Sequence, residues 1–166
     1  MFGVPVNYKD AQGDWKKIDT GLHREDAGAG YAAKSGGNDW SVQLPDDLGD
    51  KPVRVSEGSD WATFKLRDSA GAPSVKGNKG SYKNAVGGVD AEFSVHPDAL
   101  KEDLVLASRD APASYTYELA ASEGLAAKPT SKGGIDFNNA KGQTAFTIAP
   151  PVVEDMRITP TPQSSA

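Results

Sequence analysis

The chain has 166 residues, a net charge of −5 at pH 7 and a sequence pI near 5.0. No apolar run is long enough for a membrane-spanning helix, and no heptad pattern indicates a coiled coil. The acidic balance argues against a nucleic-acid-binding surface. Cysteine is absent, which excludes disulfides, thiolate metal sites and cysteine nucleophiles. The composition predicts a folded domain with a thin core and long polar loops.

Alternating apolar and polar residues predict short strands along most of the chain. The clearest alternation occurs at residues 4–8, 40–44, 89–95, 115–119 and 146–148. Shorter runs predict further strands at residues 15–19, 53–56, 61–66, 104–107, 125–127 and 135–137. Residues rich in Gly and Asn separate these runs, as hairpin turns require. Helix signals are weak, and a single helical turn is predicted at residues 97–103.

These patterns predict an all-β fold: an antiparallel β-sandwich or two packed small β-sheets, with little helix. Residues 1–156 are expected to form the β-sandwich module. A segment rich in Gly, Ser and Pro at 71–80 predicts a sub-boundary, although a long connection inside one sandwich explains it equally well. Residues 157–166 read as an extended Pro/Ser/Thr tail. No signal peptide is visible, and the abrupt start is typical of a piece of a larger protein.

Several stretches, in order, carry a resemblance to a known family. They include Val4-Pro-Val-Asn-Tyr8, Gly13-Asp-Trp-Lys-Lys-Ile-Asp-Thr20, Tyr82-Lys-Asn-Ala-Val-Gly-Gly-Val-Asp90, Leu100-Lys-Glu-Asp-Leu-Val-Leu106, Gly134-Ile-Asp-Phe137 and Phe146-Thr-Ile-Ala-Pro-Pro151. The chain resembles the region preceding the YD repeats of wall-associated and RHS-type polymorphic toxin proteins of Gram-positive bacteria, which often adjoins DNRLRE-type modules. The resemblance covers residues 4–155, nearly the whole chain.

This resemblance implies a secreted or cell-wall-associated protein whose toxic chemistry lies in a separate domain. It supplies no catalytic residues, and the chain itself carries neither YD repeats nor a toxin domain. We therefore expect a non-catalytic structural or attachment module, not an enzyme, whose partners are the neighbouring modules of its parent protein. No contact with nucleic acid and no insertion into a membrane are expected.

Exposed aromatic side chains offer an alternative function, a carbohydrate-binding module that holds cell-wall glycan. Such modules stack sugar rings on Trp or Tyr. Trp15 lies beside a turn with Lys16 and Lys17, so it is the tryptophan expected to be exposed. Tyr31 and Tyr82 are the candidates that would complete a ligand-binding platform with it. Packing in the core is the competing explanation for each of these rings.

No cofactor is required by any motif, and calcium is the metal that the acidic loops would accept. Asp46, Asp47 and Asp50 place three carboxylates in one loop, and calcium prefers oxygen ligands. The same residues are equally typical of turns and soluble surfaces. Zinc lacks ligands, because cysteine is absent and the two histidines, His23 and His96, are isolated in sequence.

A hydrolase is the third and least favoured function. Ser and Asp are plentiful, yet no Gly-x-Ser-x-Gly elbow marks a nucleophile. A pocket in the folded protein that joins His23 or His96 to a carboxylate and a serine would favour the hydrolase function.

Overall fold

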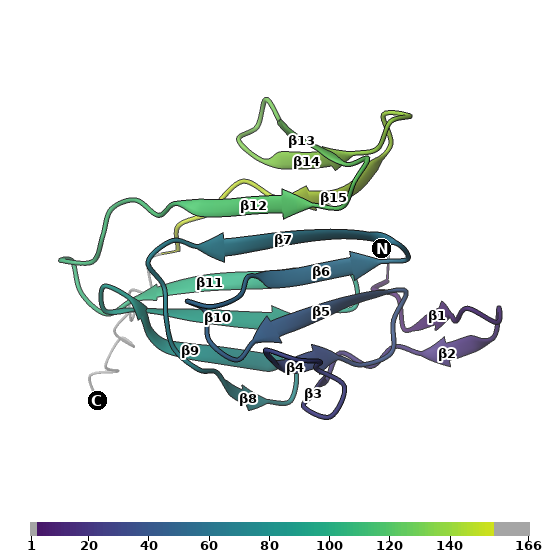
Figure 1. The fold of residues 1–166 in the computed structure, drawn as a ribbon, viewed down its shortest axis with the longest axis horizontal. Coiled ribbons are helices and arrows are strands. Elements are labelled where there is room, and N and C mark those ends of the chain that lie inside the picture. The colour runs from purple at the N-terminus through teal and green to yellow at the C-terminus, as the bar shows by residue number, and fades with distance from the viewer. Residues whose placement is uncertain (1–2, 155–166) are drawn as a thin grey trace, which may run out of the picture. The chain divides into compact units, whose positions relative to one another are not determined.

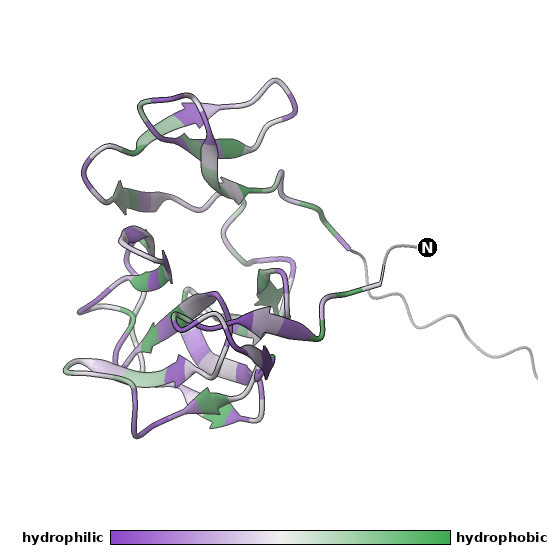
Figure 2. Ribbon diagram, turned by 90° about the vertical axis from the view of Figure 1, so that its right-hand side faces the viewer, coloured by the Kyte–Doolittle hydropathy of each residue, from purple (hydrophilic) through white to green (hydrophobic). Residues whose placement is uncertain are grey.

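The computed structural model describes residues 3–154, and the chain divides into two units, Met1–Gly124 and Leu125–Ala166. The described residues form antiparallel strands and no helix, which confirms the predicted all-β fold. They therefore contain no helix long and apolar enough to cross a membrane. The predicted tail at 157–166 lies outside the described residues. Both apolar and polar residues occur along single strands (Figure 2), as expected where one face of a sheet is buried.

The larger sheet of the first unit has six strands in the order β12-β7-β6-β5-β4-β3 (Figure 1). Its strands are β3 (Leu22–His23), β4 (Tyr31–Ser35), β5 (Trp40–Pro45), β6 (Val53–Glu57), β7 (Asp60–Leu66) and β12 (Tyr117–Ala121). Strands β3 to β7 pair with their neighbours in sequence, whereas β12 returns from later in the chain to pair with β7. The two edges of this sheet are thus β3 and β12.

The second sheet of this unit has four strands in the order β11-β10-β9-β8. Its strands are β8 (Ser74–Lys76), β9 (Lys79–Val86), β10 (Val89–Val95) and β11 (Leu100–Leu106). The turn from β9 to β10 consists of Gly87 and Gly88, with φ values of +53° and +81°. Two consecutive positive φ values are what a tight two-residue hairpin requires, and glycine adopts them without strain.

The core of the first unit lies between the two sheets. The largest of its fully buried side chains are Tyr82, Phe93, Leu44, Val42, Val53 and Val89. The Phe93 ring on β10 lies 6.2 Å from the Phe64 ring on β7, centroid to centroid, so aromatic contacts cross from one sheet to the other. Burial of each such aliphatic or aromatic side chain contributes about 1.5–3 kcal/mol. This apolar layer holds the sandwich together.

The two sheets approach each other closely at Gly80 on β9. A side chain there would collide with Leu44 on β5, in the opposite sheet. Glycine is required at this position by packing and not by its backbone conformation, because its φ is not positive. The Tyr82 hydroxyl, two residues further along β9, donates a hydrogen bond of 2.7 Å to the Pro45 carbonyl. These two contacts set the alignment of β9 against β5.

A separate hairpin precedes the sandwich, formed by β1 (Asn7–Lys9) and β2 (Trp15–Lys17) (Figure 1). Its turn is closed by the Asp10 carboxylate, which accepts the backbone N–H groups of Gln12 and Asp14 at 3.0 and 2.9 Å. The chain leaving the hairpin is tied to the sandwich, since the Asp19 N–H donates to the Gly37 carbonyl at 2.8 Å.

The second unit, described as far as residue 154, is a three-stranded antiparallel meander. Its strands are β13 (Ala126–Pro129), β14 (Ile135–Asn138) and β15 (Thr144–Ile148). Phe137 is its buried side chain. The turn between β14 and β15 is shaped by the side-chain Oδ1 of Asn139, which accepts the backbone N–H groups of Lys141 and Gln143.

Every strand predicted from the sequence overlaps an observed strand, but some elements differ. The helical turn predicted at 97–103 is wrong, because β11 begins at Leu100 and pairs with β10 along its whole length. Strands β3, β4, β8 and β9 carry no clean alternation and were not predicted. Residues 71–80, the alternative boundary, lie inside the first unit and contain β8 and its turn to β9.

Candidate functional site

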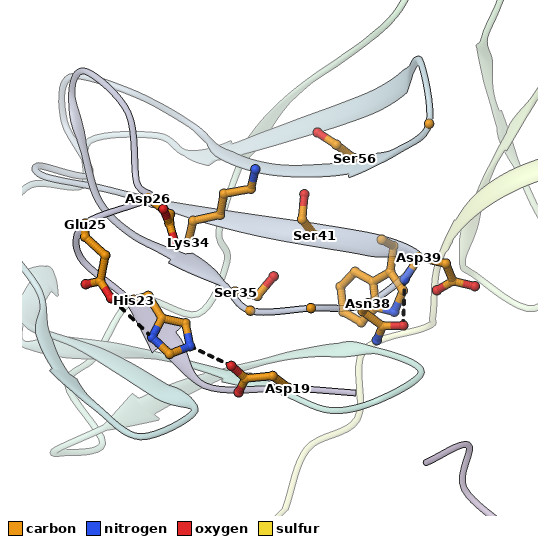
Figure 3. Close-up of a pocket in the computed structure, with 14 residues that line it drawn as sticks. Asp19, His23, Glu25, Asp26, Lys34, Ser35, Asn38, Asp39, Ser41 and Ser56 are labelled. Atoms are coloured by element: carbon orange, nitrogen blue, oxygen red, sulfur yellow. Dashed lines mark hydrogen bonds and ion pairs between the residues drawn. The ribbon is translucent and has the colours of Figure 1, made fainter. Parts of the chain in front are cut away.

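A broad, open depression of about 740 Å³ lies beside strands β3 to β6 of the first unit (Figure 3). Its lining is strongly polar. The charged side chains in it are Asp19, His23, Glu25, Asp26, Lys34 and Asp39. Carboxylates outnumber the basic groups, so the depression carries net negative charge at neutral pH.

His23 lies between two carboxylates in this depression (Figure 3). Its Nε2 is 2.7 Å from Asp19 Oδ2, and its Nδ1 is 3.8 Å from Glu25 Oε1. The hydrogen bond with Asp19 raises the pKa of His23. The backbone N–H of Gly21, together with His23, lowers the pKa of Asp19. Both shifts favour the charged pair, in which protonated His23 bonds the Asp19 carboxylate.

Local turn structure positions the Asp19 carboxylate. Its Oδ1 accepts the Gly21 N–H at 2.8 Å, which is an Asx turn. Gly21 in turn accepts the Gly36 N–H through its carbonyl at 2.9 Å. A side chain at Gly36 would collide with the Asp19 carboxylate, so a glycine is needed opposite it. The segment from Asp19 to His23 thus folds back against the start of the β4–β5 loop.

The depression contains the residue types expected of a hydrolase site, since His23, a carboxylate and several serines line it. The geometry does not form a nucleophile pair. Both ring nitrogens of His23 face carboxylates, and the buried Ser35 hydroxyl already accepts the Val42 N–H at 2.9 Å. Within residues 3–154, no hydrogen bond joins a histidine ring to a serine hydroxyl. A Ser-His arrangement requires that bond.

Trp15 on β2 is exposed, as the sequence led us to expect. It keeps 69% of its surface accessible, and the Lys9 ammonium on β1 lies 5.2 Å from the centroid of its ring. A cation near the face of a tryptophan is attracted to the ring and helps hold it in place. Trp15 is therefore an exposed aromatic on the hairpin, with a cation beside its ring.

Tyr31 and Tyr82, the other proposed platform residues, lie in different environments. Tyr31 on β4 is half-buried, and the Lys51 ammonium lies 5.0 Å from its ring centroid. Tyr82 is fully buried in the core between the sheets, so its ring offers no face to a ligand in this structure. A sugar platform made of Trp15, Tyr31 and Tyr82 together is thus not present, and the reason is the burial of Tyr82.

The other two tryptophans serve packing. Trp40 packs against the core, and its indole N–H donates to the Pro97 carbonyl at 3.1 Å. Trp61 on β7 is covered by Arg54, whose guanidinium carbon lies 4.6 Å from the ring centroid. Both arrangements leave Trp15 as the tryptophan with a largely free surface.

The acidic loop proposed as a calcium site is organised by backbone contacts. The Asp47 carboxylate accepts the N–H groups of Gly49 and Gly71 at 2.7 and 3.1 Å. The Asp47 carbonyl accepts the Asp50 N–H. In the described part of the chain, no three His, Asp or Glu side chains gather as metal ligands, so Asp46, Asp47 and Asp50 do not converge. Asp47 acts here as a turn residue.

Two arrangements of side chains in the structure were not predicted from the sequence. Lys9 lies directly opposite Trp15 in the β1–β2 register, and Lys17 lies on the same face of the hairpin. Glu102 on β11 and Tyr117 on β12 are hydrogen-bonded across the sandwich edge. The alternation of the two strands could have indicated the first arrangement once their register was known. No local signal could have indicated the second, because it depends on the return of β12.

Comparisons with known proteins find distant and partial relatives. No protein-family profile and no solved structure matches the chain. The tRNA3(Ser)-specific nuclease WapA of Bacillus spizizenii is 24% identical over 103 residues, 62% of this chain and 4% of that protein. The tRNA(Glu)-specific nuclease WapA of Bacillus subtilis subsp. natto is 27% identical over 92 residues, 55% of this chain and 4% of that protein. The tRNA nuclease WapA of Bacillus subtilis (strain 168) is 24% identical over 103 residues.

The chain thus spans about 4% of the length of the curated relatives that it matches. This similarity to WapA proteins supports the broader part of the resemblance found in the sequence. It does not address the YD repeats, whose relation to this chain stays a prediction.

Proposed function

We propose that the chain is a non-catalytic structural and attachment β-module of a longer, secreted, wall-associated protein of the RHS/YD-repeat toxin type. The observation that carries this proposal is the short extent of the match. It covers about 4% of the length of each relative, and these relatives are named as nucleases. Nearly all of each relative, with ample room for a catalytic domain, lies outside the matched segment. The module would pack against its neighbours in the parent protein and hold it at the cell wall.

The polar depression supports a non-catalytic role. His23 is hydrogen-bonded to Asp19, its other ring nitrogen faces Glu25 at 3.8 Å, and the Ser35 hydroxyl is engaged by the backbone. A general base needs a free ring nitrogen within reach of its proton donor, and a nucleophile needs such a base. This geometry supplies an ion pair that stabilises a turn.

The test of non-catalysis is an assay of the purified chain on tRNA, with and without divalent metal. We expect no cleavage above the buffer control, and the same result for His23→Ala. Cleavage of tRNA that His23→Ala abolishes would overturn the proposal and assign the depression as an active site.

The attachment role is tested by co-sedimentation of the chain with purified cell walls. Saturable binding is expected. Absence of binding to every wall fraction would leave a module that contacts only the rest of its parent protein.

A carbohydrate-binding module is the second candidate, and the exposed ring of Trp15 favours it. Sugar rings stack on exposed tryptophans, and a hairpin presents such a ring without competition from the core. The matched comparison is Trp15→Ala against Leu106→Ala, because Leu106 is also exposed but lies on β11. Loss of glycan binding in the first variant alone would support this function.

A further inference from the structure

We propose that the outer face of the β1–β2 hairpin binds an anionic carbohydrate polymer. This hairpin face consists of Asn7, Lys9, Trp15 and Lys17. Sugar rings of the polymer would stack on Trp15, and its acidic groups would pair with Lys9 and Lys17. The inference rests on the proposed attachment role and names the partner and the surface that perform it.

The strand register places these four side chains together. Asn7 pairs with Lys17, and Lys9 pairs with Trp15. Because side chains alternate between the two faces of a strand, both pairs lie on one face, while Tyr8 and Lys16 lie on the other. All four residues of the hairpin face are exposed. Neighbours lie about 5 Å apart across the strands and about 7 Å apart along them, which matches the size of a sugar ring and its substituents.

The opposite side of the hairpin is turned toward the sandwich. The Tyr8 hydroxyl occupies the space in which a side chain at Gly37 would lie. Tyr8 and Ile18 are both half-buried, and the Asp19 N–H is bonded to the Gly37 carbonyl. The hairpin is therefore anchored by one side, and the face with Trp15 is the one left to solvent.

The charge of the hairpin face differs from that of the whole chain. The net charge of −5 argues against a polyanion bound over the general surface. Alternation, however, places Lys9 and Lys17 on the hairpin face, which contains no acidic residue. Asp10 is directed into the turn, where its carboxylate accepts two backbone N–H groups, and Lys16 lies 3.9 Å from it. In residues 3–154 neither the Lys9 nor the Lys17 ammonium is paired with a carboxylate, so anionic groups find two ammonium groups at this one location.

The contact between Lys9 and Trp15 couples charge to ring recognition. The ammonium lies 5.2 Å from the ring centroid, so an acidic group paired with Lys9 brings the sugar that carries it next to the indole. A neutral glycan would use the ring alone, and a polyanion without rings would use the lysines alone. The combination selects a polymer that has both features.

A carbohydrate fits this surface better than a nucleic acid does. Nucleic acid carries a charge at every phosphate and is held by extended basic grooves with many contacts. The hairpin face has two lysines and no arginine, and the surrounding chain is acidic. A polymer with more widely spaced negative charges is repelled less by the acidic surface around the hairpin.

The experiment measures binding of the full chain, at low ionic strength, to four probes. Polygalacturonate has rings and charge, dextran has rings alone, polyglutamate has charge alone, and poly(A) represents nucleic acid. We expect polygalacturonate to bind most tightly and added salt to weaken its binding. Lys9→Glu, Lys17→Glu and Trp15→Ala should each weaken it by about fivefold.

Matched control variants separate this surface from general charge and hydrophobicity. Lys76→Glu makes the same charge change on the exposed β8–β9 hairpin, and Leu106→Ala removes another exposed apolar side chain. Both should leave the affinity for polygalacturonate unchanged. Equal weakening by Lys76→Glu, no effect of Trp15→Ala, or tighter binding of poly(A) than of polygalacturonate would overturn the inference.

Cell-wall co-sedimentation keeps this inference separate from the proposed function. Wall binding by the wild-type chain that the three hairpin variants retain would support attachment and overturn the hairpin surface. Absence of wall binding together with hairpin-dependent binding of polygalacturonate would support the surface and overturn the attachment role.

Discussion

The Tyr117 hydroxyl on β12 donates a hydrogen bond to the Glu102 carboxyl on β11, with 3.1 Å between Oη and Oε1. Strands β12 and β11 are the edges of two different sheets, so this bond joins the sheets along one side of the sandwich. Glu102 also borders a small cavity of about 10 Å³ that Phe64 and Phe93 help to line. Burial in this apolar setting raises the pKa of Glu102 to about 7.

This buried carboxyl predicts a specific pH dependence of stability. In the unfolded chain Glu102 ionises near pH 4.5, whereas in the folded protein it ionises near 7. Since the unfolded state loses its proton first, the folded state loses stability as the pH rises from about 4.5 to about 7, by about 3 kcal/mol. Glu102→Gln should remove this loss and still accept the Tyr117 hydrogen bond.

Urea unfolding at several pH values measures the effect. The difference in free energy of unfolding between Glu102→Gln and the wild type should grow through that pH range and then level off. A difference that does not change with pH would contradict the raised pKa. Glu118→Gln serves as the control, because Glu118 is an exposed carboxylate on β12.

Removing the Tyr82 hydroxyl should destabilise the sandwich. In Tyr82→Phe the buried Pro45 carbonyl loses its donor, which lies 2.7 Å away in the native protein. An unsatisfied buried acceptor costs about 1–3 kcal/mol. Thermal or urea unfolding measures this loss. Tyr31→Phe, at a half-buried ring on β4, should change stability by less than about 0.5 kcal/mol; equal losses in the two variants would refute the assignment.

Gly80→Ala should destabilise the first unit because its new methyl group collides with Leu44. Overpacking of this kind costs about 1–3 kcal/mol. The collision is relieved if the opposing side chain is shortened, so Gly80→Ala combined with Leu44→Val should lose less stability than the sum of the two single variants. A double-mutant cycle measures this coupling. Strict additivity would show that the two residues do not meet.

Asp19→Asn should lower the pKa of His23 toward its ordinary value. The substitution weakens the hydrogen bond that chiefly raises this pKa and removes the nearest negative charge. The titration of the His23 imidazole protons by NMR measures the shift. An unchanged His23 titration would mean that the 2.7 Å contact with Asp19 is absent in solution.

The sequence predicted most strand positions because alternation is a local property. The run Val89-Asp-Ala-Glu-Phe-Ser-Val95 became β10, since its odd-numbered residues bury one face of a sheet. Strand prediction failed where buried and exposed side chains do not alternate along the strand. The residues Leu100-Lys-Glu-Asp-Leu look helical in isolation, yet β11 forms there because β10 pairs with it along its length.

The candidate residues show the same division. Exposure of Trp15 was predictable from its position beside a polar turn. Burial of Tyr82 was not, because it depends on β9 facing β5 across the core and on the carbonyl of Pro45 lying within reach. The Asp19–His23 pair lies within five residues, yet both residue types are common in loops, and only the turn at Gly21 directs the two side chains together.

The amino-acid sequence by itself determined that the chain is all-β, lacks thiol chemistry and has an exposed tryptophan beside an N-terminal turn. These properties follow from composition and from side-chain alternation within single strands. Only the tertiary structure decided which strands became sheet edges, that Glu102 meets Tyr117, and that Lys9 lies opposite Trp15. Such relationships depend on strand register and on the return of β12, which arise when distant segments bury a common core.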